Sequence, residues 1–173
     1  GSHAVGAMVV AGVDGFLKKE YRKFNIKNLE LIPGDDYGML KEVLNRRLKK
    51  FGQHKKENLE IIWPDLIIID GGLGHLRVAK KVLNRLNVKC IQIISIAKGK
   101  NRNFGNERLF LNNEKEITLD IKDPIFYFLQ RLRDEAHRFA ISSHRARRSK
   151  EISKSPLDKI PGIGRNRKRA ILH

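Results

Sequence analysis

The sequence is poor in cysteine and in acidic residues, and it has no long apolar run. Its single cysteine, Cys90, cannot form an internal disulfide. Because Cys90 lies within the apolar segment 88–96, we expect it to be a buried core thiol. No stretch approaches the roughly 18 consecutive apolar residues that a membrane span needs, and no signal peptide precedes the first apolar segment. We therefore expect a soluble, cytoplasmic protein with one main domain and a small appendage.

Basic residues are the abundant class. The chain has 36 Lys and Arg against 19 Asp and Glu, a net charge of +17. Such an excess is typical of a protein with a polyanionic partner, nucleic acid first of all. The excess is concentrated in residues 131–173, which contain 13 basic and 4 acidic side chains. A lysine-rich solvated surface would give a similar composition, so charge alone leaves that alternative open.

Residue patterns in the first half predict a mixed α/β fold. Segments 5–12 and 16–26 are rich in β-branched and aromatic residues, and the turn Asp14-Gly15 predicts that they pair antiparallel. A helix is predicted to start at 33–36 and to end near Gly52. Residues 64–70 form an apolar run typical of a central strand buried on both faces. A helix over 73–86 and a strand over 89–97 complete a βαβ unit.

The second half predicts a hairpin, a long helix and an appendage. Segments 108–111 and 116–119 suggest the hairpin, and Asp123-Pro124 opens a helix that we expect to end near Arg148. After a linker at 149–155, the segment 157–164 contains Pro-Gly-Ile-Gly, which is typical of a helix-hairpin-helix motif that exposes backbone N–H groups to phosphate. The long helix is predicted to bury one apolar stripe. Its members are Ile125, Phe128, Leu129, Leu132, Ala136, Phe139 and Ala140.

Asp70 is the leading candidate for chemistry. A carboxylate is costly to bury without a partner, yet Asp70 closes the apolar run and precedes two glycines that allow a ligand to approach the backbone. Mg²⁺ and Mn²⁺ prefer oxygen ligands and stabilise attacking or leaving oxygens in phosphoryl transfer. The alternative is that Asp70 simply caps the helix that begins at Leu73.

A histidine on the long helix could complete the site. His137 lies one turn from Arg133 and Asp134, and histidine can act as a general acid, a general base or a metal ligand. The alternative is an ordinary polar helix face. Asp35 and Asp36 are likewise either functional acids or ordinary helix caps.

Other phosphate-binding motifs are incomplete. Gly71-Gly72-Leu73-Gly74 lies between a strand and a helix, but Arg77 occupies the third glycine position of a dinucleotide fingerprint and no P-loop lysine follows. We therefore expect no small-molecule cofactor. Pro64-Asp65 could start a restriction-type nuclease motif, but no Asp/Glu-x-Lys pair follows through Ala97.

Four blocks in order resemble the UvrC family, the incising subunit of bacterial nucleotide excision repair. They are PDLIIIDGGLG at 64–74, IAKGKNR at 96–102, RDEAHRFA at 133–140 and PGIG at 161–164. The resemblance implies a ribonuclease H-like mixed sheet flanked by helices, with a truncated helix-hairpin-helix segment at the C-terminus. It also implies a DNA endonuclease, dependent on Mg²⁺ or Mn²⁺, that makes the 5′ incision beside a lesion. Its partners would be damaged double-stranded DNA and the UvrB–DNA complex, after UvrA and UvrB have located the damage.

The resemblance also assigns residues. Asp70 matches a metal-binding aspartate, His137 the catalytic histidine beside the metal, and Asp36 in PGDDYG another acid associated with incision. The first catalytic aspartate of the family lies upstream of VGAMVV. We interpret residues 1–3 as an expression-tag scar in its place and expect this carboxylate to be missing. His75 and Leu73 depart from a usual Gln and Lys.

The expected domain organisation follows from these segments. Residues 4–148 would be the endonuclease domain, 149–155 a linker and 156–173 the start of the helix-hairpin-helix domain. The expected DNA contacts are Arg133, Arg138, Arg145, Arg147, Arg148, Gly162, Gly164, Arg165 and Arg167. One alternative is a non-enzymatic DNA-binding or scaffold module with the same fold. Another is a metal-dependent ribonuclease or transposase-like enzyme, which should carry three or more acids around its metal and no Pro-Gly-Ile-Gly segment.

Overall fold

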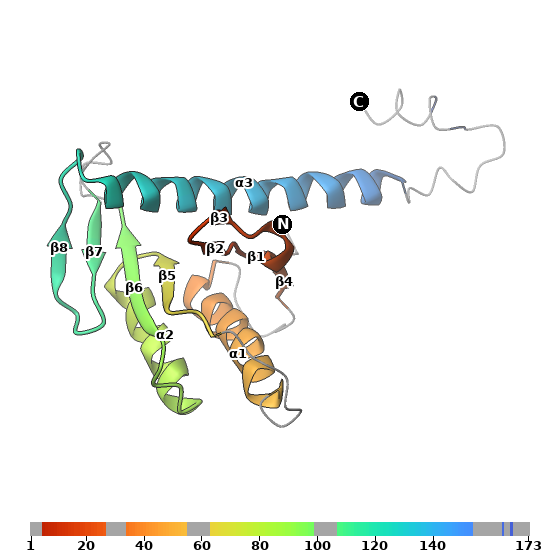
Figure 1. Cartoon of the computed structure of the whole chain (residues 1–173). Helices are drawn as coiled ribbons and strands as arrows, with labels where there is room; N and C mark the ends of the chain where they lie inside the picture. Colours follow the sequence, from red (N-terminus) through yellow and green to blue (C-terminus); the bar gives the residue numbers. More distant parts are fainter. Residues whose placement is uncertain are drawn as a thin grey trace.

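The computed structural model describes residues 5–26, 34–54, 63–98, 107–153, 164 and 167, with backbone alone for 50–54 and 142–153. A four-stranded mixed sheet lies between two short helices and one long helix, and a small N-terminal hairpin lies beside it (Figure 1). This is the mixed α/β architecture that the sequence predicted. None of the described helices is both long enough and apolar enough to cross a membrane.

The N-terminal hairpin has two short ladders. Strand β1 (Val5–Met8) pairs antiparallel with β4 (Arg22–Asn25), and β2 (Ala11–Gly12) pairs with β3 (Gly15–Phe16). Gly15 has φ 113°, a value that favours glycine, so the predicted Asp-Gly turn is confirmed. The pairing is interrupted because a 3-10 helix, η1 (Lys18–Glu20), stands before β4.

Helix α1 (Asp36–His54) begins where Asp35 caps it. The backbone N–H of Gly38 donates to Asp35 Oδ1 at 2.8 Å, which satisfies one of the free donors of the first turn. Leu44 and Leu48 are buried on its inner face. The helix ends at His54, two residues beyond the predicted end at Gly52.

The βαβ unit is confirmed. Strands β5 (Leu66–Asp70) and β6 (Gln92–Ala97) are parallel and are joined through α2 (Leu73–Arg85). Ile69 packs with α1 and α2, and Ile68 packs on the opposite face with α3. Within the described residues β5 pairs with β6 alone, so it is the edge strand of the described sheet and its predicted central place stays a prediction. Its apolar run reflects helices on both faces.

The sheet continues through an antiparallel hairpin, β7 (Arg108–Phe110) and β8 (Glu116–Thr118), in the order β5-β6-β7-β8. The chain then enters α3 (Pro124–Ser153), whose first turn is capped when Ile125 N–H donates to Asp123 Oδ1 at 2.8 Å. The helix runs past the predicted end near Arg148 and through most of the predicted linker.

The buried face of α3 differs from the predicted stripe. Phe126 and Leu129 are buried, whereas Ile125 and Phe128 are exposed. The contact of α3 with β6 and β7 is narrow and buries the side of the helix that carries Phe126. The sequence pattern did not distinguish Phe126 from the apolar residues next to it. Cys90 is also exposed, so the prediction of a buried thiol is wrong. It lies in the bend before β6 and not in the strand itself.

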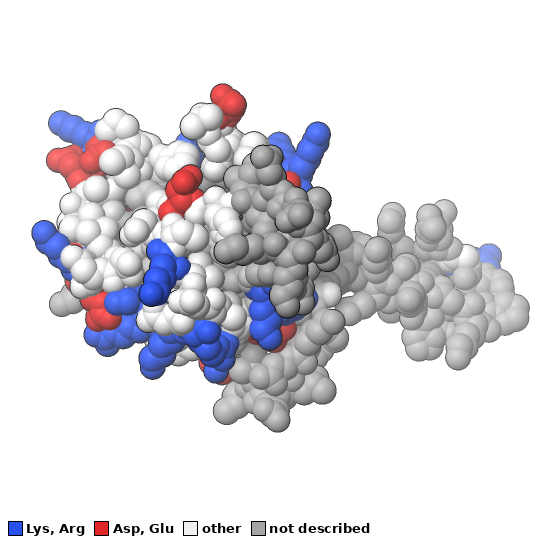
Figure 2. Space-filling model, turned by 60° about the horizontal axis from the view of Figure 1, so that its bottom comes forward, with Lys and Arg blue, Asp and Glu red and all other residues white. Residues whose placement is uncertain are grey.

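Basic side chains also occupy the described domain and not only the C-terminal segment. Figure 2 shows lysine and arginine gathered along one edge of the visible face, with acidic side chains interspersed among them. The excess of basic residues in the composition therefore extends to the surface of the described domain.

Candidate active site

Asp70 ends β5 and faces partly outward. Its backbone pairs with Ile96, and Gly71 N–H donates to the Ile96 carbonyl at 2.9 Å, which fixes the strand end. The carboxylate is 44% exposed. Helix α2 has Gly72 as its N-cap, with no side-chain capping hydrogen bond. Asp70 is therefore not the cap of α2, and its side chain is available for other partners.

His137 on α3 is the first of these partners. Its Nε2 lies 2.8 Å from Asp70 Oδ2, although the two residues are 67 positions apart in the chain. The His137 side chain is 54% exposed, so both groups can be reached from solvent. The fold thus joins the two residues that the sequence predicted as metal ligands.

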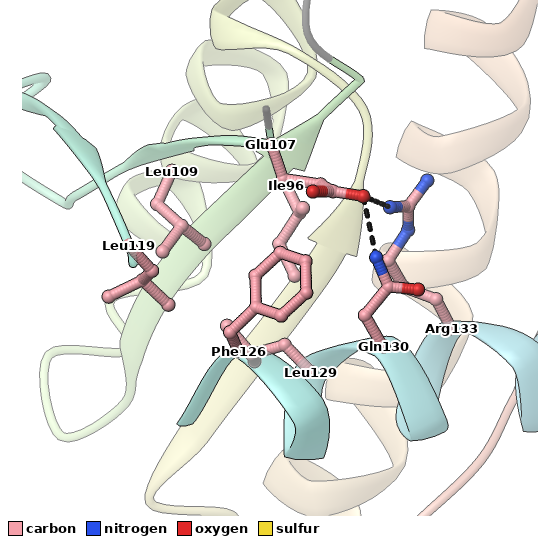
Figure 3. A pocket seen from close by; sticks show the side chains of 8 residues that line it. All are labelled: Ile96, Glu107, Leu109, Leu119, Phe126, Leu129, Gln130 and Arg133. Atoms are coloured by element: carbon pink, nitrogen blue, oxygen red, sulfur yellow. Dashed lines mark hydrogen bonds and ion pairs between the residues drawn. The ribbon is translucent and has the colours of Figure 1, made fainter. Parts of the chain in front are cut away.

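A largely buried polar cluster lies beside this pair. Arg133 Nε is 3.2 Å from Asp70 Oδ1, and Arg133 Nη1 is 3.7 Å from Glu107 Oε1. Gln130 Nε2 donates to the same Glu107 oxygen at 2.6 Å. Figure 3 shows these three side chains meeting at one end of a small pocket whose remaining walls are apolar. The cluster links the Asp70 carboxylate to the interior of the domain.

Sequence reasoning missed Glu107 and Gln130, and it interpreted Arg133 only as a DNA contact. A helical signal was present, because Phe126, Gln130, Arg133 and His137 recur at spacings of three or four along α3 and share one face. No comparable signal marks Glu107, which is brought to the cluster by the hairpin that follows β6.

The glycine loop after Asp70 permits a close approach of aromatic side chains. A Cβ on Gly71 would collide with the His75 ring, and a Cβ on Gly74 would collide with Tyr37. The rings of Tyr37 and His75 are 4.7 Å apart between centroids, and Tyr37 is half exposed. His75 thus packs against the start of α1, beside the strand end that carries Asp70.

Asp36 is exposed in the first turn of α1. Within the residues that the structure describes, no group of three or more His, Cys, Asp and Glu side chains is arranged to hold a metal ion. Asp36 therefore does not form a ligand set with Asp70 and His137 here. Its predicted part in incision stays a prediction.

Arg138, a predicted DNA contact, is engaged with Glu135. Its Nε and Nη2 donate to the two Glu135 oxygens at 2.7 and 2.6 Å, and Tyr21 Oη donates to Glu135 Oε1 at 3.0 Å. The hydrogen bonds from Arg138 lower the pKa of Glu135. Burial, and then the bond to Glu135, raises the pKa of Tyr21. This contact ties α3 to the N-terminal hairpin.

The Glu135 contact gives a pH-dependent prediction. A lowered pKa means that the folded state favours the carboxylate, so this stabilisation is present above the ordinary pKa of 4.5 and is lost as pH falls through the lowered value. We expect Glu135→Gln to lower the melting temperature slightly at neutral pH, and the difference from the parent protein to vanish in acid. Thermal denaturation across pH 3–7 measures this.

The matched control is Glu20→Gln, because Glu20 pairs with Arg22 on the surface and both side chains are about half exposed. Such exposed pairs contribute little to stability. A pH-independent difference for Glu135→Gln would contradict the ionic origin of the contact.

The other predicted DNA contacts lie mainly outside the described side chains. Only residues 164 and 167 of the helix-hairpin-helix segment are described, and both are exposed. Those outside are Arg145, Arg147, Arg148, Gly162 and Arg165.

A mixed sheet flanked by helices, with a carboxylate and an imidazole at one strand end, is consistent with a ribonuclease H-like domain. The chain belongs to the family described as the UvrC RNAse H endonuclease domain, whose model matches residues 1–141.

Three bacterial relatives, each named UvrABC system protein C, illustrate the similarity. The chain is 54% identical over 173 residues to the protein of Paramagnetospirillum magneticum, and 51% identical to those of Rhodospirillum rubrum and Caulobacter vibrioides. Each alignment covers the whole of this chain. It covers only 28%, 27% and 27% of the length of the respective relatives. The chain thus spans little more than a quarter of the length of these proteins.

Proposed function

We propose that this chain is the endonuclease domain of a nucleotide excision repair subunit. It would hydrolyse a phosphodiester of damaged double-stranded DNA with a divalent metal ion, making the 5′ incision beside the lesion in concert with UvrA and UvrB. The observation that carries the proposal is the 2.8 Å contact between Asp70 Oδ2 and His137 Nε2 at the exposed end of β5. Membership of the UvrC endonuclease family supports it.

The Asp70–His137 pair fits a divalent ion. Asp70 would offer a carboxylate oxygen and His137 an imidazole nitrogen, 2.8 Å apart and both partly exposed, in place of the hydrogen bond that now joins them. Mg²⁺ commonly uses one or two protein carboxylates and fills its other positions with waters and substrate phosphate oxygens. Asp70 and His137 would therefore hold Mg²⁺ or Mn²⁺ with a small protein ligand set.

Each residue then has a defined role. A bound ion supplies Lewis-acid polarisation of the scissile phosphate and lowers the pKa of bound water. Asp70 provides the anionic oxygen Oδ2, and Arg133 lies 3.2 Å from its other oxygen, Oδ1. His137 acts at Nε2, as a ligand or as the carrier of a proton between water and solvent. Because both side chains are half exposed, the backbone of a DNA strand can reach them.

A second candidate is a non-enzymatic DNA-binding or scaffold module. One observation favours it. Among the described residues, Asp70 and His137 are two candidate metal ligands, and no third His, Cys, Asp or Glu joins them in a metal-binding group. In that case Asp70 and His137 would only fasten α3 to the sheet. The two candidates differ in whether the protein needs a metal to act on DNA.

The test is Mn²⁺-dependent nicking of damaged duplex DNA by the full-length protein together with UvrA and UvrB. This chain alone and a version extended upstream to include the family's first aspartate are compared in parallel. Nicking that requires the upstream segment and is lost in Asp70→Ala supports the nuclease. Tight DNA binding with neither nicking nor metal binding in any version supports the scaffold.

Salt dependence tests the electrostatic part of the proposal. The net charge of +17 should bind DNA through phosphate contacts that release counterions. A protein that contacts about six phosphates loses about a thousandfold in affinity between about 50 and 200 mM salt. We expect a loss of this order for the chain, measured by fluorescence anisotropy with labelled duplex. A flat response would show that the basic residues are only a solvated surface.

A further inference from the structure

Arg133 lies in an unusual position for a residue that would grip DNA. Its side chain is only 10% exposed, whereas Arg138, on the same helix, is 63% exposed. Burying a charged group is costly unless carboxylates compensate it. Arg133 has two such partners, Asp70 on β5 and Glu107 at the start of the β7 hairpin. The arginine therefore belongs to the interior of the site.

The two oxygens of Asp70 have different partners. Oδ1 lies 3.2 Å from Arg133 Nε, and Oδ2 lies 2.8 Å from His137 Nε2. Arg133 approaches the carboxylate from the buried side, and His137 approaches it from the exposed side. Oδ2 is therefore the oxygen on the exposed side, beside the His137 nitrogen that would share an ion with it. Rotation of the carboxylate would break both contacts at once.

Arg133 is itself held by a second layer. Its Nη1 lies 3.7 Å from Glu107 Oε1, and Gln130 donates to this same oxygen at 2.6 Å (Figure 3). Glu107 is 14% exposed. Arg133 Nε and Glu107 Oε2 are both buried and make no well-aligned hydrogen bond. The ion pair at 3.2 Å is therefore the contact that joins Arg133 Nε to Asp70.

We infer that Arg133 is a positioning residue for Asp70, fixed in turn by Glu107. It sets which carboxylate oxygen faces the ion, and it acts on the reaction through metal affinity and not by touching DNA. The inference rests on the proposed function, because it concerns the ion held by Asp70 and His137. Outer-layer partners of metal ligands typically change metal affinity by about 10- to 100-fold when they are removed.

The experiment is a Mn²⁺ titration of the full-length protein, followed by electron paramagnetic resonance. Asp70→Asn serves as the reference, so that the difference reports this site alone. The variants are Arg133→Met, Arg133→Lys, Glu107→Gln and the double variant Arg133→Met/Glu107→Gln. The control is Arg77→Met. Arg77 lies on α2, and the change removes its exposed ion pair with Glu114. Nicking rate, KM for DNA and melting temperature are measured for each.

We expect Arg133→Met to raise the half-saturating Mn²⁺ concentration at least tenfold and to leave KM for DNA unchanged. Arg133→Lys should recover part of the loss, because lysine keeps the charge but lacks the guanidinium fork. Glu107→Gln should weaken metal binding less. The double variant should be no worse than Arg133→Met, because both changes interrupt the same chain of contacts.

Several results would overturn the inference. Arg133→Met could melt at a lower temperature and yet, while folded, bind Mn²⁺ with the parental affinity. Arg133 would then have a purely structural role. A raised KM for DNA with unchanged Mn²⁺ affinity would make it a DNA contact. If the parent protein binds Mn²⁺ at Asp70 but never nicks, the proposed nuclease function fails while the titration still decides the role of Arg133. If it binds no Mn²⁺ there, both fail.

Discussion

Asp70→Asn is expected to reduce metal-dependent nicking by about a thousandfold. The substitution keeps the size of the side chain but removes the charge that would hold the ion. Lewis-acid assistance contributes several kcal/mol to such reactions, and each 1.36 kcal/mol corresponds to a factor of ten in rate. The measurement is the single-turnover nicking rate of the full-length protein with UvrA and UvrB on a substrate with one lesion.

The control for this variant is Asp65→Asn. Asp65 is exposed and comes directly before β5, at the end of the strand opposite Asp70, so it lies outside the site. We expect it to nick at the parental rate. Melting curves must accompany both variants, because Asp70→Asn leaves the buried Arg133 with Glu107 as its remaining carboxylate. A folded Asp70→Asn protein that nicks normally would refute the assignment.

His137→Asn should lower nicking by about 10²- to 10⁴-fold, the range typical of a lost general acid or base. Asparagine removes the imidazole nitrogen that lies 2.8 Å from Asp70. Added imidazole would restore activity if His137 carries a proton, whereas excess Mn²⁺ would restore it if His137 is a ligand. The measurement is the nicking rate as a function of each additive.

The matched control is Asp134→Asn, an exposed acid on the neighbouring turn of α3. Unchanged nicking in this variant would show that the effect of His137→Asn is specific to the imidazole. A His137→Asn protein that is fully active without additives would leave the Asp70–His137 contact with a structural role only.

Most of the fold could be predicted because its signals are local. The Asp-Gly turn, the Asp35 and Asp123 caps and the apolar period of α1 each depend on residues a few positions apart. The place of β5 in the sheet could not be predicted in this way. An apolar strand covered by helices on both faces has the same composition at the edge as in the centre. The exposure of Cys90 depends on where β6 begins, and element boundaries are the least certain part of a sequence pattern.

The site was predicted in part for a similar reason. Asp70 and His137 stood out through the strand end and through the motif blocks that resemble a known family. Their direct contact depends on how α3 crosses the end of β5, which is a tertiary feature. Glu107 had no sequence signal, because a single acid before a short strand is common. The low exposure of Arg133 could not be predicted either, because arginines on a basic helix are usually solvated.

The length of α3 sets a distance as well as a contact. The helix continues from His137 to Ser153, which corresponds to about 24 Å at about 1.5 Å per residue. Because α3 is one continuous helix, it holds the backbone at Ser153 at this set distance from the Asp70–His137 pair.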